Sequence, residues 1–212
     1  MNALFLVKCI DKVNDVIIKN EKEIESLDRA IGDGDHFINL KRGCNAIQSI
    51  NDELLPLNNS QIFQRIGMKI LSTVGGASGP LFATFFLEIS KTIKDSEDEL
   101  RNFCEGFTQA VNAIKKRGKS DIGQKTMLDV LIPVAETLKS NSGNDVDRQK
   151  LLDAIDTEAL KGVLMTKDLI PTKGRAASLG ERAVGHIDPG AKSCQLIINA
   201  ICILLKEIEV KK

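Results

Sequence analysis

The chain has 212 residues, of which 42% are hydrophobic, so it is long enough to fold around a sizeable apolar core. Its 29 Lys and Arg residues balance 29 Asp and Glu residues, and this neutral charge argues against a nucleic-acid partner. No proline- or serine-rich linker divides the chain, which favours one domain over residues 1–212.

The N-terminal segment and the cysteines indicate the compartment. Charged residues interrupt the first 20 positions, which excludes the apolar core of a signal peptide, and no apolar run reaches membrane-spanning length. The five cysteines form no C-x-x-C pair, which fits reduced, buried thiols better than disulfides or a zinc site. We therefore expect a cytoplasmic protein without a membrane partner.

Apolar residues recur at intervals of three and four nearly throughout, which predicts an all-α fold. We expect long helices over residues 4–20, 36–49, 61–74, 80–93, 96–117, 126–139, 147–165 and 189–206. Most connections between them are short, so successive helices should run antiparallel. This pattern predicts an eight-helix, up-and-down bundle or barrel.

Several helix ends carry recognisable signals. Pro80 suits the first turn of a helix, where its missing N–H would have no partner. Ser96 followed by Glu99 has the spacing of a capping box. Asp188 and Pro189 form a typical N-cap and first-turn pair for the last helix.

The stretch 27–36 is the strongest candidate for chemistry. It places Asp28, Asp33 and Asp35 within eight residues, and Gly32 and Gly34 allow the backbone to bend so that their side chains converge. Crowded carboxylates repel one another unless a hard divalent cation binds them. A solvated acidic turn is the alternative that this stretch alone leaves open.

Three further glycine-containing loops, 75–80, 118–126 and 171–190, should lie at the same rim, because an even number of long helices separates each from the next. Helix N-termini there suit phosphate, and the aspartates suit Mg²⁺, so a Mg-nucleotide site is predicted. The standard motifs are incomplete: 118–120 matches only the end of a Walker A, and Cys44 stands where an EF-hand needs glutamate.

Five blocks of sequence, within 27–43, 74–82, 123–127, 174–182 and 185–191, include GDGDH, GQKTM, LGER and GH-x-DPGA. In this order, and over nearly the whole chain, they resemble the nucleotide-binding subunit of dihydroxyacetone kinases. A chain of this length is most similar to the stand-alone ADP-binding L subunits of the phosphoenolpyruvate-dependent enzymes. The resemblance implies an eight-helix barrel that holds ADP or ATP and two Mg²⁺ at one rim.

The resemblance also implies roles for individual residues. The metal ligands would be Asp28, Asp33 and Asp35, and Arg175 would be a catalytic residue that also contacts nucleotide. The remaining nucleotide contacts would be His36, Phe37, Ile38, Asn39, Ala77, Ser78, Gly118, Met127, Asp188, Pro189 and Gly190.

The resemblance further implies how the protein works. In this family the nucleotide stays bound, is recharged by a histidine-phosphorylated phosphotransferase subunit, and phosphorylates dihydroxyacetone held on a separate kinase subunit. A homodimer is left open. Two other functions also remain open, namely an ATP-exchanging kinase component for another small substrate and a regulatory module that senses nucleotide.

Two sequence features bear on nucleotide contact. Phe37 replaces a glycine that is usual in the family, and we expect its ring to narrow the mouth of the site and slow nucleotide loss. The chain has no Trp or Tyr, and its other phenylalanines fit the core, so adenine should be held by aliphatic or methionine side chains.

Overall fold

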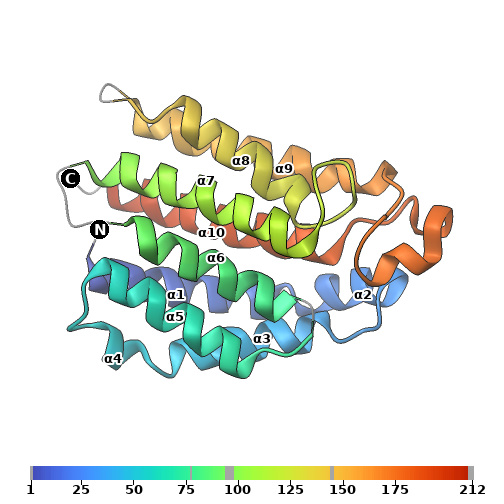
Figure 1. The fold of residues 1–212 in the computed structure, drawn as a ribbon, viewed down its shortest axis with the longest axis horizontal. Coiled ribbons are helices and arrows are strands. Elements are labelled where there is room, and N and C mark those ends of the chain that lie inside the picture. The colour runs from blue at the N-terminus through green and yellow to red at the C-terminus, as the bar shows by residue number, and fades with distance from the viewer. Residues whose placement is uncertain (1, 77, 94–97, 144–145, 210–212) are drawn as a thin grey trace.

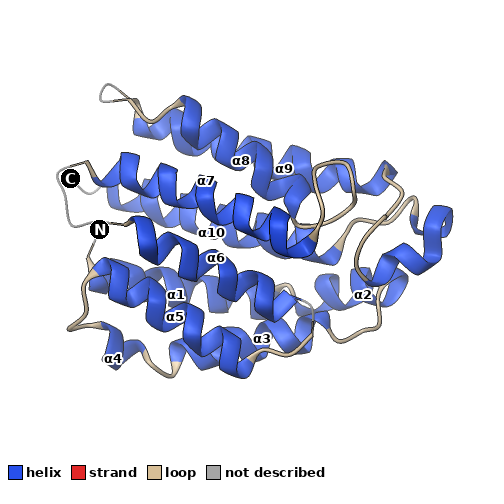
Figure 2. Cartoon of the chain, in the orientation of Figure 1, coloured by secondary structure: helices blue, strands red, loops and turns tan. Residues whose placement is uncertain are grey.

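The computed structural model describes residues 2–76, 78–93, 98–143 and 146–209. Within these ranges every regular element is a helix, so the predicted all-α class is confirmed (Figure 2). None of the helices in this part of the chain is both long and apolar enough to cross a membrane.

The described residues contain all eight expected long helices, together with two additional α-helices and two 3₁₀ segments. The elements are α1 (Ala3–Lys19), α2 (Glu21–Ile31), α3 (His36–Gln48), α4 (Asn51–Leu54), α5 (Asn59–Thr73), α6 (Ser78–Thr92), α7 (Glu99–Gly118), α8 (Leu128–Ser140), α9 (Arg148–Met165), η1 (Thr166–Asp168), η2 (Arg175–Ala183) and α10 (Pro189–Glu209). Figure 1 shows the long helices running side by side in alternating directions.

The eight long helices close into a ring. Contacts link α1 to α3, α3 to α5, α5 to α6, α6 to α7, α7 to α8, α8 to α9, α9 to α10, and α10 back to α1. This closed order of neighbours is that of a barrel, which the alternating helix directions predicted.

Helix α2 was not predicted from the sequence, and it takes in the first part of the aspartate stretch. Residues 27–31 are the last turns of a helix, so only residues 32–35 form the turn. The helix was missed because Glu21–Ile31 carries many charges and its buried face is narrow, with Ile24, Asp28 and Ile31. A helix whose buried face includes an aspartate lacks the apolar periodicity from which helices are predicted.

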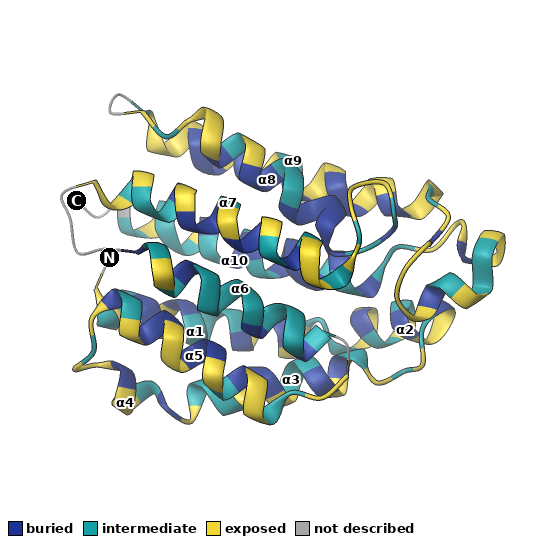
Figure 3. Cartoon of the chain, viewed as in Figure 1, coloured by how far each residue is buried: buried dark blue, intermediate teal, exposed yellow. Residues whose placement is uncertain are grey.

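The inward faces of the helices form the core (Figure 3). On α7 the buried residues include Cys104, Phe107, Val111 and Ile114, which recur at intervals of three and four. The ring of Phe85 makes edge contacts with Phe107, at a centroid distance of 5.1 Å. These phenylalanines line an apolar cavity of about 430 Å³ inside the barrel, so their assignment to the core is confirmed.

Helix ends follow the predicted signals where they can be compared. Pro80 lies in the first turn of α6, and Ala191 N–H donates to Asp188 Oδ2 at 2.7 Å at the start of α10. Ser96 lies outside the described residues, and the side chain of Asp98 caps α7 by accepting from Arg101 N–H at 3.2 Å.

The five cysteines are buried free thiols, as expected from their scattered spacing. Burial raises the pKa of Cys9 to about 12 and that of Cys44 to about 11. These thiols therefore stay protonated at neutral pH and are poor nucleophiles.

Candidate functional site

Four loops meet at one end of the barrel, on the right in Figure 1. Arg175 Nε lies 2.8 Å from Asp33 Oδ2, and Thr172 N–H donates to Gln124 O at 3.5 Å. A side-chain carbon on Gly76 would lie 3.9 Å from Asp35 Oδ2. The predicted meeting of the stretches 27–36, 75–80, 118–126 and 171–190 is therefore confirmed.

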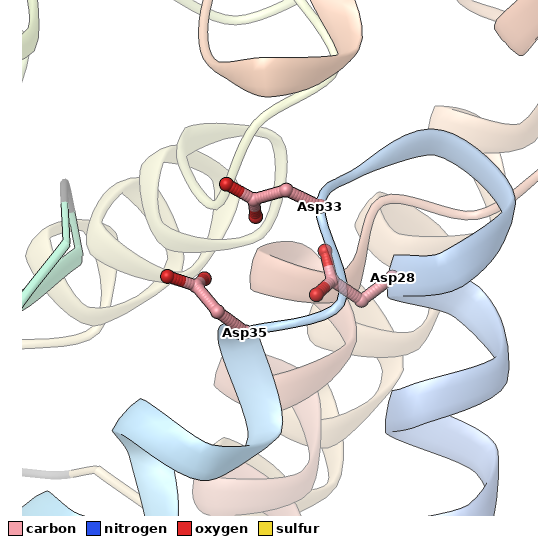
Figure 4. A group of neighbouring side chains, drawn as sticks. All are labelled: Asp28, Asp33 and Asp35. Carbon is pink, nitrogen blue, oxygen red and sulfur yellow. The ribbon is translucent and has the colours of Figure 1, made fainter.

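The three aspartates converge at this rim (Figure 4). Asp28 lies in the last turns of α2, Asp33 in the following turn, and Asp35 immediately before α3; one carboxylate oxygen from each lies within 4.8 Å of the others. Asp28 is only 4% exposed, whereas the other two are open to solvent. Oxygen ligands in this arrangement fit a hard divalent cation such as Mg²⁺.

Two glycines allow the aspartates to converge. Gly32 N–H donates to Asp28 O at 2.6 Å, and a side-chain carbon on Gly32 would lie 1.9 Å from Asp28 Oδ1. Gly34 has φ +79°, in the left-handed region that other residues rarely adopt. The turn therefore needs glycine at both positions. A side chain at residue 32 would clash with Asp28, and residue 34 needs a positive φ.

His36 joins the aspartates to the first turn of α10. Its backbone N–H donates to Asp28 Oδ2 at 3.0 Å, and its Nε2 lies 2.8 Å from Ser193 Oγ. Because the Ser193 hydroxyl donates to Pro189 O at 2.8 Å, we infer that the hydrogen between the two side chains comes from Nε2. Burial lowers the pKa of His36, and the nearby charge of Asp28 opposes this shift.

Arg175 begins η2 and forms an ion pair with Asp33. Its side chain is 71% exposed, so the guanidinium is at the open mouth of the site rather than inside the protein. In this structure it balances the charge of the aspartate cluster, from a position where it could also reach a bound phosphate.

The expectation that the Phe37 ring covers the site is wrong. Phe37 is 2% exposed and packs in an apolar cluster with Ile17, Ile24 and Leu196. The sequence pattern suggested a residue at the mouth because Phe37 follows His36 directly, but the first turn of α3 directs neighbouring side chains to different faces. Ile38 is exposed, while Asn39 is buried and accepts from Arg42 Nη1 at 3.4 Å.

The other expected nucleotide contacts also lie at this rim. Ser78 begins α6, Gly118 ends α7, and Pro189 and Gly190 begin α10, whereas Ala77 lies outside the described residues. Met127 is buried in the core. A side-chain carbon added to Gly190 would lie 3.9 Å from the Cβ of Met127, so the two residues are neighbours.

Sequence reasoning missed a buried polar group beneath the loops. Lys125 Nζ donates to Thr166 O and to His186 O, each at 2.5 Å. The Asp129 carboxylate accepts from Gly123 N–H at 2.5 Å and from Thr126 N–H at 2.7 Å. The spacing of Thr126 and Asp129 before an apolar run resembles a capping box. This spacing could have predicted the hydrogen bond from Thr126 N–H to Asp129.

The charge of Asp188 gives a testable pH dependence. Burial raises its pKa to about 7, although the hydrogen bond from Ala191 N–H stabilises its charged form. The folded state therefore holds this proton more tightly than the unfolded chain, and Asp188 lowers stability progressively as pH rises from about 4 to above 7.

The Asp188→Asn substitution should remove this effect, because asparagine cannot ionise and also caps helices well. Relative to wild type, its free energy of unfolding should rise between about pH 4 and pH 8. Urea denaturation of both proteins across this range provides the measurement. A difference that does not change with pH would contradict the prediction.

Comparison with known proteins gives consistent matches. The family model for the DAK2 domain matches residues 30–203. The chain is 40% identical over 183 residues to "PEP-dependent dihydroxyacetone kinase 1, ADP-binding subunit DhaL" of Listeria innocua, covering 86% of this chain and 87% of that protein. It is 33% identical over 203 residues to "PEP-dependent dihydroxyacetone kinase, ADP-binding subunit DhaL" of Escherichia coli, covering 95% and 97%.

A solved structure has the same fold. The dihydroxyacetone kinase from C. freundii in complex with AMP-PNP and Mg²⁺ superimposes with a TM-score of 0.75 and 26% sequence identity. The match covers 96% of this chain and 34% of that chain, so this chain spans about a third of the C. freundii protein.

Proposed function

Because the chain belongs to the DAK2 domain family, we propose that it is the ADP-binding subunit of a phosphoenolpyruvate-dependent dihydroxyacetone kinase. It binds ADP or ATP with Mg²⁺ at the rim of the barrel and takes part in phosphoryl transfer to dihydroxyacetone. The convergence of Asp28, Asp33 and Asp35 at that rim is the observation that carries the proposal.

The residues at the rim suit this chemistry. Asp28, Asp33 and Asp35 would hold two Mg²⁺, which neutralise phosphate charge when bound. The N-termini of α3, α6 and α10 lie at the same end, and the positive ends of their helix dipoles would favour phosphate oxygens there. Arg175 would leave Asp33 when a cation binds there and would then act as the catalytic residue that stabilises charge on the transferred group.

The remaining nucleotide contacts follow from the same proposal. The main chain of 36–39 at the start of α3 and the start of α6 at Ser78 would bind phosphates. Gly118, Met127 and the turn at 188–190 would enclose the rest of the nucleotide. Since the Phe37 ring packs in the core, this residue would contribute its backbone alone.

The five thiols and the imidazole of His36 are poorly placed to carry phosphate. All five thiols are buried, and His36 Nε2 contacts Ser193 Oγ while the backbone N–H of His36 donates to Asp28. The phosphoryl group would therefore pass through the bound nucleotide, from a histidine-phosphorylated phosphotransferase subunit to a substrate held by a separate kinase subunit.

Reconstitution with partner subunits tests the function. The chain loaded with ATP and Mg²⁺ should leave dihydroxyacetone unchanged, and should phosphorylate it once the dihydroxyacetone-binding subunit is added. Repeated turnover should require the phosphodonor subunit. After incubation with a labelled phosphodonor and denaturation, the label should be in nucleotide and absent from protein.

Other outcomes identify the alternatives. Turnover driven by free ATP without a phosphodonor would indicate an ATP-exchanging kinase component. Nucleotide binding without transfer to any substrate would indicate a regulatory module that senses nucleotide. Label retained on His36 or His186 would show that the chain itself relays the phosphoryl group.

A further inference from the structure

Lys125 combines two features that are costly in a folded protein. It is 1% exposed, and among the described residues it belongs to the largest fully buried side chains. Its backbone has φ +57°, in the left-handed region that is unfavourable for residues other than glycine. A buried ammonium group with a strained backbone persists only where the surrounding contacts hold it.

Those contacts connect loops that are distant in sequence. Lys125 lies between α7 and α8, Thr166 lies at the end of α9, and His186 lies just before α10. The two hydrogen bonds from Nζ to the carbonyl oxygens of Thr166 and His186 therefore hold three segments of the rim together.

Nearby carboxylates support the ammonium group. Burial lowers the pKa of Lys125, but the charges of Asp188, Asp168 and Asp129 oppose that shift. Asp129 is fully buried and bonds the backbone on both sides of Lys125, at Gly123 and Thr126. Asp129 thus holds the backbone on both sides of Lys125, and the negative charge of Asp188, when ionised, favours the ammonium form of the lysine.

From Lys125 a continuous path of contacts leads to the aspartate cluster. Thr166 Oγ1 accepts from Asp188 N–H at 3.1 Å, and the Asp188 carboxylate caps α10 at Ala191. Ser193, one turn after Pro189 in α10, contacts the side chain of His36. The backbone N–H of His36 in turn donates to Asp28.

We propose that Lys125 is a positioning residue for the bound nucleotide, holding the turn at 186–190 and the start of α10 in register with the aspartate cluster. The inference rests on the proposed function and concerns a residue outside the proposed metal and nucleotide contacts. Mutation of outer groups that orient metal ligands typically costs about tenfold to a hundredfold in metal affinity or activity.

The Lys125→Met substitution tests the proposal, because methionine has a similar length but neither charge nor N–H donors. In the full chain, the dissociation constant for Mg-ADP, measured by calorimetry at 25 °C, should rise roughly tenfold to a hundredfold. The far-UV circular dichroism should match that of wild type. A merely structural role would lower the melting temperature and leave the dissociation constant of the folded protein unchanged.

Lys206→Met is the matched control. Unlike Lys125, Lys206 is only partly buried; it pairs with Asp153 at 2.5 Å and lies near the other end of α10. Its dissociation constant for Mg-ADP should stay within about twofold of wild type. The inference is overturned if Lys125→Met also binds within twofold.

If Lys125→Met does not fold, a second pair of variants tests whether the contacts around Lys125 position the nucleotide. Thr166→Ser keeps the hydroxyl that accepts from Asp188 N–H, whereas Thr166→Val removes it at nearly constant volume. Serine should preserve Mg-ADP affinity and valine should weaken it, and equal affinities would overturn the inference. Failure of wild type to bind Mg-ADP would instead overturn the proposed function, and this inference with it.

Discussion

The Asp28→Asn substitution should abolish the stabilisation of this protein by Mg-nucleotide. At a hundredfold excess over its dissociation constant, a ligand stabilises a protein by about 2.7 kcal/mol. For a domain of this size that corresponds to a rise of roughly 5–11 °C in melting temperature. The wild type should show this rise with Mg-ADP and lose it with a chelator, whereas the variant should show neither change.

Asparagine at position 28 tests the charge of the side chain separately from its shape. It has the same shape as aspartate, and its amide oxygen can still accept from His36 N–H, so the turn should persist. What it removes is the negative charge that a divalent cation requires. Phosphoryl transfer in the reconstituted complex should fall by about a hundredfold or more, as when a main electrostatic group is lost.

Asp52→Asn provides the control, because Asp52 is an exposed carboxylate on α4, which follows the end of α3 remote from the aspartate cluster. It should retain the full response to Mg-ADP and to chelator. If Asp28→Asn responds like this control, the aspartate cluster is not the metal site.

The Gly32→Ala substitution should impair the same site without altering any ligand. The backbone of Gly32 is extended, with φ −123° and ψ −153°, so alanine can adopt its conformation. The added methyl group, however, would lie 1.9 Å from Asp28 Oδ1 and 2.9 Å from Asp28 O. The Asp28 carboxylate must therefore shift from the position in which it converges with Asp33 and Asp35.

Two measurements follow from this steric conflict. Mg-ADP affinity should fall roughly tenfold to a hundredfold, because the aspartates no longer converge. The free energy of unfolding, measured by urea denaturation without ligand, should fall by about 1–3 kcal/mol from overpacking.

The Gly143→Ala substitution is the matched control, since a side-chain carbon there would meet nothing within 4 Å. It should leave both the affinity and the free energy of unfolding nearly unchanged. Wild-type affinity in Gly32→Ala would show that the position of the Asp28 carboxylate does not govern binding.

Much of the barrel was predictable because its information is local. A helical stripe such as that of α7 recurs within a few residues, and Pro80 and Asp188 mark helix starts through their own backbone chemistry. The short loops then implied alternating directions and a shared rim. α2 escaped because its buried face includes Asp28, which no hydrophobic pattern records.

At the site, the sequence by itself determined which carboxylates could meet, since Asp28, Asp33 and Asp35 are close in the chain and glycines bend the turn between them. Only the tertiary structure decided which distant groups meet them. It placed Arg175 against Asp33, directed Phe37 into the core, and buried Lys125 beneath the rim. Such contacts depend on packing between segments that are far apart in the chain. The periodicity of one segment does not show which other segment packs against it.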